Sequence, residues 1–266
     1  DGHAIGMATA RLDTVAEGFI AEELLRLDIP ALGATHRATV RTRVELNRAL
    51  ALRTFTFDLD SDAGRFAVRG ESRADTLLDL TIGAGGDEER TSIRLEDGAI
   101  LPTALPLRLA AGGRLRVGEA FGVRIFDPST LAPRTIEIHV AEHDTLLVAD
   151  TAAWDAEARR WTPVPDTLPA WRIEETFGGV SVSSWVDDDG RLIRAESPLG
   201  FTLERVAYEV AREEWNRSRG DPALAGGYGV VIEGSAIASD VDLDAVGVVE
   251  RLAVRLLGVE LEGFDL

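Results

Sequence analysis

The chain has 266 residues, of which 45% are hydrophobic and 28% charged, a composition typical of a folded globular protein and not of a disordered or fibrous one. Its 46 acidic residues outnumber 28 basic ones, and the resulting formal charge of −18 repels nucleic-acid phosphates and anionic lipid headgroups. General nucleic-acid binding is therefore not expected. No apolar run approaches the roughly 18 residues of a membrane-spanning helix, so we expect no transmembrane span.

Several residue types are missing, and their absence excludes several kinds of chemistry. Every basic residue other than histidine is Arg, and the chain contains no Lys, Gln or Cys. Without thiols and amines it can form no cysteine nucleophile, no disulfide and no lysine Schiff base. We expect no cofactor. The absence of cysteine fits an extracytoplasmic protein, periplasmic or secreted, and this is the location we predict.

Alternation of polar and apolar side chains predicts strands over most of the first two hundred residues. From Thr35 to Leu46, charged and mostly apolar residues alternate with a period of two, as in a half-solvated antiparallel strand. The same pattern continues over Leu50 to Asp60. The polar turn Asp60 to Gly64 then leads into a strand over Arg65 to Gly70. Strands joined by short polar turns are typical of an antiparallel meander.

Further strands and two helices are predicted in chain order. A short helix is expected over Pro102 to Ala111, because prolines mark its start and Gly112-Gly113 follows its end. A second, amphipathic helix is expected within Leu203 to Arg217, and Asp187 to Gly190 predicts a tight hairpin turn. The further predicted strands cover residues 76–82, 89–95, 120–126, 134–142, 144–149, 170–177, 180–186 and 192–197.

These elements predict a mainly β protein. We expect a large curved antiparallel sheet, a meander or a half-barrel, with one or two short helices. We expect this antiparallel β domain over residues 1–220 and a linker over residues 221–229. A small C-terminal β subdomain is predicted over residues 230–266, close to the lower size limit for independent folding, so we expect it to lean on the first domain or to continue into a further domain.

Two groups of residues have the spacing of metal sites. His139 and His143 are four residues apart, but the apolar residues beside them indicate a strand, and a zinc site of this spacing requires a helix and a third ligand. Asp58, Asp60 and Asp62 resemble alternate ligands of a calcium loop, although its glycine comes one place late. We interpret both groups as surface residues and predict no metal site. No Gly-x-Ser-x-Gly elbow is present, and no catalytic residue is predicted.

Tryptophans gather in one quarter of the chain. Trp154, Trp161, Trp171 and Trp185 lie there together with several prolines, and Trp215 follows. One hypothesis is that the first four line an apolar cleft that binds a ligand. The alternative is that these large rings close the open end of a curved sheet.

The order of several segments resembles the region that precedes the catalytic domain of bacterial transglutaminase-like proteins. The likeness spans nearly the whole chain, and the segments that carry it are Ile5 to Ala8, Leu52 to Gly70, Phe126 to Leu131, Ser184 to Gly190, Glu196 to Gly200, Ser235 to Ile237 and Val249 to Asp265. In that family a papain-like Cys-His-Asp domain follows, and this chain has no cysteine. The resemblance therefore implies an accessory β region that positions or presents a partner, and it carries over no catalytic residue.

We therefore predict a non-catalytic, extracytoplasmic β protein that acts by surface recognition. It is expected to serve as the accessory region of a transglutaminase-like protein or as a subunit of a larger assembly, with a protein as its partner. The alternative is a carrier that holds a lipid or another apolar small ligand in its curved sheet. A metalloenzyme that uses His139 and His143 is the least favoured hypothesis.

Overall fold

The computed structural model describes residues 4–31, 34–73, 76–84, 86–95, 99–177, 180–198 and 200–218. The chain divides into two units, Asp1–Gly234 and Ser235–Leu266, and every described residue belongs to the first. The predicted linker over residues 221–229 and the predicted β subdomain over residues 230–266 lie outside the described residues.

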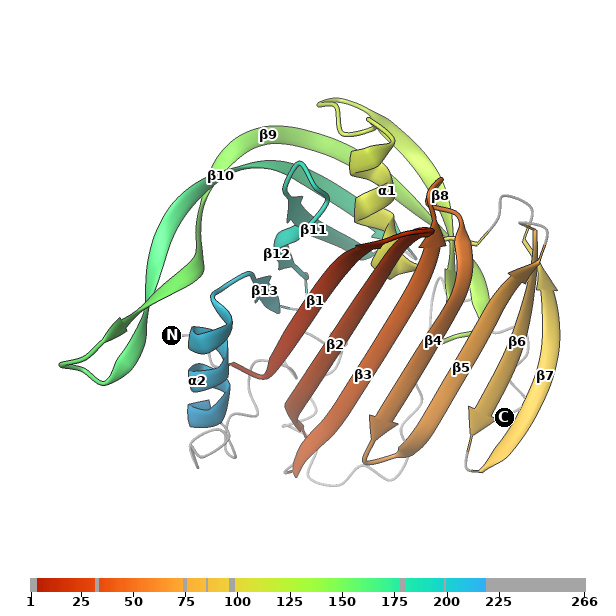
Figure 1. Ribbon diagram of the computed structural model, residues 1–266, viewed down its shortest axis with the longest axis horizontal. Helices are drawn as coiled ribbons and strands as arrows, with labels where there is room; N and C mark the ends of the chain where they lie inside the picture. Colours follow the sequence, from red (N-terminus) through yellow and green to blue (C-terminus); the bar gives the residue numbers. More distant parts are fainter. Residues whose placement is uncertain are drawn as a thin grey trace, which may run out of the picture. The chain divides into compact units, whose positions relative to one another are not determined.

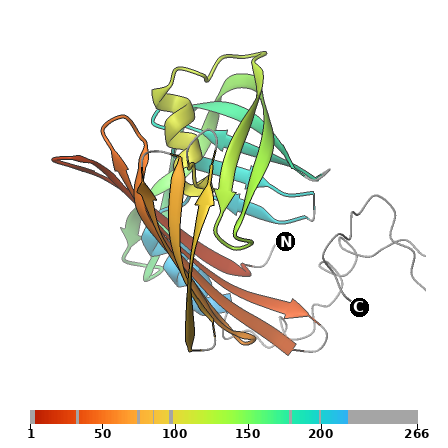
Figure 2. The same cartoon turned by 90° about the vertical axis from the view of Figure 1, so that its right-hand side faces the viewer.

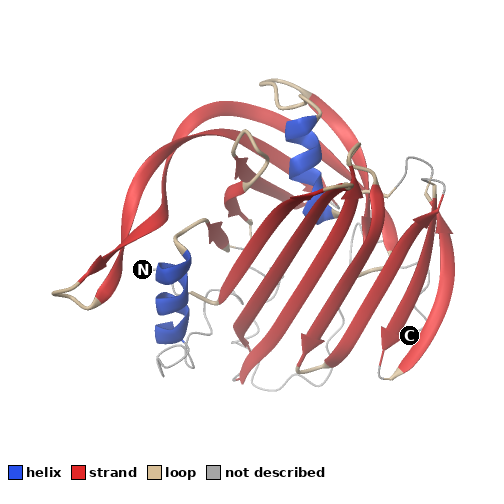
Figure 3. Cartoon of the chain, viewed as in Figure 1, coloured by secondary structure: helices blue, strands red, loops and turns tan. Residues whose placement is uncertain are grey.

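The described part of the chain is mainly β, as predicted, and contains two short α-helices (Figure 3). The first strands are β1 (Gly6–Val15), β2 (Gly18–Ala31), β3 (Ala34–Asn47), β4 (Leu52–Ser61), β5 (Gly64–Arg73), β6 (Leu77–Ala84) and β7 (Asp87–Arg94). A 3-10 turn, η1 (Pro102–Ala104), and helix α1 (Leu105–Ala111) follow, where a helix was predicted. The remaining elements are β8 (Ala120–Asp127), β9 (Ala132–Asp155), β10 (Arg160–Phe177), β11 (Val180–Val186), β12 (Leu192–Glu196), β13 (Thr202–Glu204) and α2 (Tyr208–Ser218).

The strands form two antiparallel sheets instead of one. Strands β1 to β7 make a seven-stranded meander in chain order, and β8 to β13 make a six-stranded sheet, also in chain order (Figure 1). Figure 2 shows the twist of the seven-stranded sheet from a second side. Among the described residues no pairing joins β1 to β7, so this sheet is open.

The predicted alternation gives the seven-stranded sheet one apolar face, which we call its inner face. Val44, Phe55 and Leu80 are buried there, and Val44 lies directly opposite Phe55. Opposite Phe55 on the other side is Gly70, where a Cβ atom would lie 2.0 Å from Cε1 of the phenylalanine ring. Any residue other than glycine at position 70 would therefore clash with this ring. The opposite, outer face carries most of the charged side chains of the same strands, whereas Glu23 of β2 lies on the inner face.

The segment between the two sheets covers part of the inner face. Leu101 and Ala104 are buried in the same core cluster as Phe126 of β8, whose ring lies 6.0 Å from that of Phe55. Thr103 donates a hydrogen bond of 2.7 Å from its hydroxyl to Glu23 of β2. Desolvation of the Glu23 carboxyl raises its pKa, and the hydrogen bond from Thr103 opposes that change.

The six-stranded sheet differs from the prediction in one region. We predicted separate strands over residues 134–142 and 144–149 and none over residues 150–169; β9 instead runs unbroken to Asp155, and β10 begins at Arg160. Three prolines at positions 163, 165 and 169 argued against a strand there. Over residues 160–170, β10 pairs only with β9. This part of β10 is an edge strand, and an edge strand tolerates proline because it has no second neighbour whose hydrogen bonds would be lost.

Candidate functional site

The β9–β10 hairpin extends beyond the rest of its sheet (Figure 1). The pairing of β8 with β9 ends at His139, and the pairing of β11 with β10 ends at Trp171. Past these points the two long strands pair with each other. We call this part of the hairpin, residues 144–170, the arm.

The base of the arm is packed and not free. Val148 and Ala170 are buried in a cluster with Ile193 of β12, and Trp185 of β11 packs against that cluster. The arm is further held by an isolated parallel bridge between Ala149 and Val206. The following amide, that of Ala207, donates a hydrogen bond of 2.9 Å to the carbonyl oxygen of Ala149.

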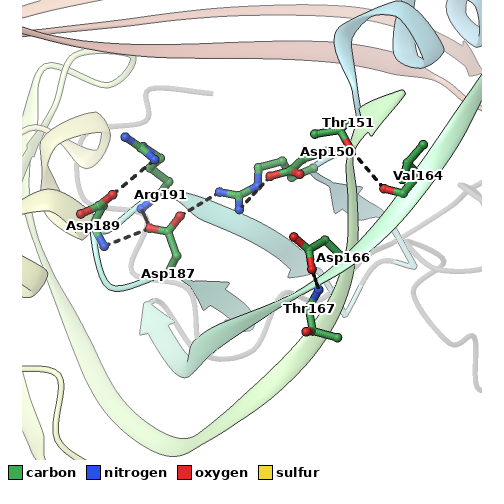
Figure 4. Close-up of polar contacts among 9 residues, drawn as sticks. Asp150, Thr151, Val164, Asp166, Thr167, Asp187, Asp189 and Arg191 are labelled. Atoms are coloured by element: carbon green, nitrogen blue, oxygen red, sulfur yellow. Dashed lines mark hydrogen bonds and ion pairs between the residues drawn. The ribbon is translucent and has the colours of Figure 1, made fainter. Parts of the chain in front are cut away.

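Arg205, between β13 and α2, links the arm to the β11–β12 turn. Figure 4 labels its two acidic partners, Asp150 and Asp187. Arg205 donates from Nη1 to Oδ2 of Asp187 over 2.9 Å, and its Nη2 lies 3.3 Å from Oδ2 of Asp150 on the arm. The other oxygen of Asp187 accepts the amides of Asp189, at 3.1 Å, and Arg191, at 2.8 Å. One carboxylate thus shapes the turn and holds the arginine that reaches the arm.

The far end of the arm is also ordered by local contacts. Asp155 Oδ1 accepts the backbone amides of Glu157 and Ala158 at 3.0 and 2.9 Å, which closes the hairpin turn. Trp154 and Trp161 lie directly opposite each other with their rings edge to face, 5.5 Å apart. Both strands are therefore fixed relative to each other up to the tip.

Large apolar side chains are exposed along this ordered arm. Leu147 is 74% exposed, Trp154 52% and Val164 43%, whereas large apolar residues elsewhere in the two sheets are mostly covered. The register shift between Val164 and Asp166 adds one residue to β9, so Val164 lies on the face of Val148 and Leu147 lies on the opposite face. Trp154, which pairs with Trp161, lies on the same face as Leu147. A partner would therefore have to contact both faces of the arm.

The β10 edge of the arm does not suit pairing with another strand. Pro163, Pro165 and Pro169 lie on β10 and lack the amide proton that a new β-ladder requires. Recognition along β10 would therefore use side chains and not the backbone.

Of the four tryptophans proposed to line one cleft, two contact each other and the other two lie elsewhere. Trp154 and Trp161 form the ring pair of the arm. Trp171 stacks on His143, with ring centroids 4.0 Å apart, and its indole donates a 2.9 Å hydrogen bond to Asp188. Trp171 lies opposite Val186, so the neighbouring Trp185 is on the other face of the sheet, where Arg194 lies 5.8 Å from its ring. The four rings do not line one shared cleft.

Four of the five residues considered for metal binding make other contacts. His139 Nδ1 lies 3.3 Å from Glu174 Oε2, and His143 stacks on Trp171. Asp60 pairs with Arg65 at 3.1 Å, and Asp62 accepts the backbone amide of Arg37 at 2.8 Å. Within the part of the chain that the structure describes, no group of three or more acidic or histidine side chains has the geometry to hold a metal ion.

The sequence patterns did not indicate the arm or its arginine link. Arg205 stands alone between two short elements, and Leu147 and Val164 look like ordinary strand residues until the neighbours of β9 and β10 are known. The cluster of tryptophans and prolines was the one signal for this region, and it did not distinguish a cleft from an arm.

Comparisons with known proteins do not assign this chain to a family. No protein-family model matches the chain, and no curated protein matches it. A β-barrel-like protein of the domain of unknown function DUF1849 from Brucella abortus is 11% identical, covers 72% of this chain and 81% of its own, and has a TM-score of 0.48. A DUF1089 family protein from Pseudomonas aeruginosa is 17% identical over 77% of this chain and 94% of its own, with a TM-score of 0.43. We base no functional conclusion on these likenesses.

No helix in the described ranges combines the length and the apolar character needed to cross a membrane.

Proposed function

We propose that this protein is a non-catalytic β protein that acts by surface recognition, with the arm as its contact surface. The observation that carries this proposal is the exposure of Leu147, Trp154 and Val164 on a hairpin that is anchored at its base and ordered at its tip. Tryptophan is among the residue types enriched in binding hot spots, and an exposed apolar surface marks an interaction site. An ordered arm also loses little conformational freedom when it binds.

The partner that we propose is a protein with a papain-like transglutaminase domain, as the resemblance of the sequence implies. Under this proposal the chain is either the accessory region of such a protein or a subunit of a larger assembly, and it is extracytoplasmic.

Site-specific photo-cross-linking in the source organism tests this proposal. A benzophenone amino acid at position 154 or 147 should cross-link to a papain-like domain, which mass spectrometry of the cross-linked peptides should identify either on one separate protein or, for an accessory region, in the same polypeptide. The matched control places the same group at Ala63, in the exposed β4–β5 turn, and should give no such product. Trp154→Ala should weaken the purified complex by about tenfold or more, the effect of losing a hot-spot aromatic.

Three results would contradict this function. Equal yields from position 154 and from Ala63 would show that the arm is not the contact surface. The absence of a discrete product from either arm position would show that no partner binds there. Capture of a protein without a papain-like domain would refute the proposed partner.

The second candidate function, a carrier of an apolar ligand, rests on a different surface. On the inner face of the seven-stranded sheet, Leu25, Val40, Leu59 and Phe66 lie directly opposite one another on four successive strands. All four are only half-buried. They form an apolar row beside the closed core, and such a row suits a hydrocarbon chain.

Binding of a fluorescent fatty acid tests the carrier function separately from the arm. Leu59→Asp should abolish binding if the row holds the ligand, whereas Trp154→Ala should leave it unchanged. A protein that fails to bind the probe, or an L59D variant that binds it fully, would refute the carrier function.

A further inference from the structure

An open hollow of about 710 Å³ lies on the outer face of the seven-stranded sheet, over β3 to β7. Its volume lies in the range of about 300 to 1,000 Å³ that is typical of small-molecule sites. Its lining is mostly polar, unlike the inner face of the same sheet. Neither the arm nor the apolar row takes part in it.

A row of alternating arginine and threonine residues crosses the hollow. Five residues on successive strands lie directly opposite one another: Arg43, Thr56, Arg69, Thr81 and Arg90. Neighbouring strands are about 4.8 Å apart, so the backbones at Arg69 and Arg90 are separated by about 10 Å, with Thr81 between them. Two arginine side chains at this spacing can converge on one group above the threonine.

Some arginines of the hollow already have acidic partners. Arg43 pairs with Glu22 and, at 3.1 Å, with Glu45. Arg73 lies 2.6 Å from Asp79, which also accepts a hydrogen bond from Ser92. These side chains neutralise one another and form the rim of the hollow.

Arg69 and Arg90 differ from these paired arginines. Both are exposed, and neither has a hydrogen bond or an ion pair with any other described residue. Glu71, two residues along β5 from Arg69 and on the same face, is likewise without a described partner. The unpaired charges of the hollow are thus two cations and one anion, on a chain whose net charge is −18.

We propose that this hollow binds a small hydroxyl-bearing molecule through a tetrahedral oxyanion, a phosphate or a sulfate. Arg69 and Arg90 donate to its oxygens from two sides, because the guanidinium fork matches such groups, and the Thr81 hydroxyl donates from below. Three converging donors suit a group with three terminal oxygens better than a carboxylate with two. Glu71 accepts a hydrogen bond from a hydroxyl of the same molecule. The overall negative charge of the protein disfavours long polyanions.

Calorimetric titration of the full chain tests the site with four probes: inorganic phosphate, sulfate, glucose 6-phosphate and uncharged glucose. Glucose 6-phosphate should bind more tightly than either inorganic ion, glucose should not bind, and the affinity should fall as the salt concentration rises. The two inorganic ions show which oxyanion the site prefers. Phosphatidylglycerol vesicles, tested in parallel, should not retain the protein, which separates a free phosphate from a lipid headgroup.

Three variants distinguish a built site from general surface charge. Arg69→Gln and Arg90→Gln should each weaken glucose 6-phosphate binding at least tenfold, the cost of one charge-assisted hydrogen-bonding group. Arg65→Gln is the matched control, because Arg65 lies on the same strand and the same face as Arg69 but outside the hollow. This variant should bind glucose 6-phosphate as tightly as the parent chain. Thr81→Val keeps every charge and should weaken binding severalfold.

The proposal is overturned if no phosphate or sulfate compound binds at millimolar concentration, or if only the vesicles bind. It is also overturned if Arg65→Gln and Arg69→Gln reduce the affinity equally. Because Arg69 and Arg90 are exposed, their variants should unfold at the same urea concentration as the parent chain. Thr81→Val provides a second test that does not depend on charge.

Discussion

Replacing Arg205 with Met would test how the arm is held. Methionine keeps most of the length and apolar character of the side chain but removes the guanidinium group that joins two carboxylates. Arg205 and Asp187 are 20% and 14% exposed at their side chains, and Asp150 is 33% exposed. The substitution therefore leaves one poorly solvated carboxylate, that of Asp187, without its cationic partner.

The expected loss of stability follows from these exposures. Removing one partner of a fully buried ion pair costs about 3–5 kcal/mol. Here the loss should be smaller, because Asp187 keeps two amide donors on its other oxygen and Asp150 is partly in water. A hydrogen bond to a charged group contributes about 1.5–3 kcal/mol. We therefore expect Arg205→Met to lower the free energy of unfolding by about 2–3 kcal/mol.

The same cluster supplies a matched control. Arg191 and Asp189 lie 3.3 Å apart with both side chains more than 60% exposed, and such a surface pair contributes about 0–1 kcal/mol. Urea unfolding of Arg205→Met and Arg191→Met measures the difference directly. Hydrogen exchange at the amide of Ala207, which donates to Ala149 on the arm, reports whether the link to the arm opens locally.

Equal unfolding free energies for the two variants would refute the reasoning, and so would unchanged protection of Ala207 in Arg205→Met. The double variant Arg205→Met/Asp187→Asn gives a further check. Because it removes the charge left without a partner, it should recover part of the stability that the single variant loses.

Two further predictions concern the sheets. Gly70→Ala should destabilise the protein by about 1–3 kcal/mol in urea unfolding, because the alanine Cβ would lie 2.0 Å from the ring of Phe55. Gly122→Ala is the control and should destabilise the protein much less, because the nearest atom to its Cβ is the end of a flexible side chain at 3.2 Å. Desolvation raises the pKa of Glu175, so the folded chain holds this proton to higher pH than the unfolded chain and stability falls as pH rises through that interval. Glu175→Gln should therefore be more stable than the parent at pH 7, a difference that should vanish below about pH 4, where the unfolded carboxyl is also protonated; a difference that persists there would contradict the assignment.

Local patterns were sufficient to predict strands β3 to β7 of the seven-stranded sheet, whereas no strand was predicted at β1 or β2. The alternation from Thr35 to Leu46 corresponds to β3, and the turn predicted at Asp60 to Gly64 joins β4 to β5. Such strands are half-buried, so each residue reports its own face and the period of two is visible in the sequence. The helix at Pro102 to Ala111 was predictable for the same local reason, since its start and end signals lie in its own sequence.

The arm was not predictable, because its strands depend on which neighbours they have. Three prolines exclude a central strand but are compatible with an edge, and the sequence does not say where β11 stops pairing with β10. The predicted break after Glu142 was wrong for a related reason. A hairpin with one partner on each strand has no constant buried face, so its polarity does not alternate regularly along its length.

The row of Arg43, Thr56, Arg69, Thr81 and Arg90 could not be predicted from the sequence for the same reason: it depends on which strands are neighbours. Its members are 9 to 13 residues apart in the chain and become neighbours only because four successive hairpin registers align them. A shift of one residue in the β5 register would turn Arg69 to the apolar inner face and Val68 outward. The buried Val68 and the ring of Phe55 over Gly70 therefore fix the position of Arg69 on the opposite face. The core residues that hold this sheet together also determine which charges meet on its surface, which is why a binding surface can be inferred here from packing when no sequence motif marks it.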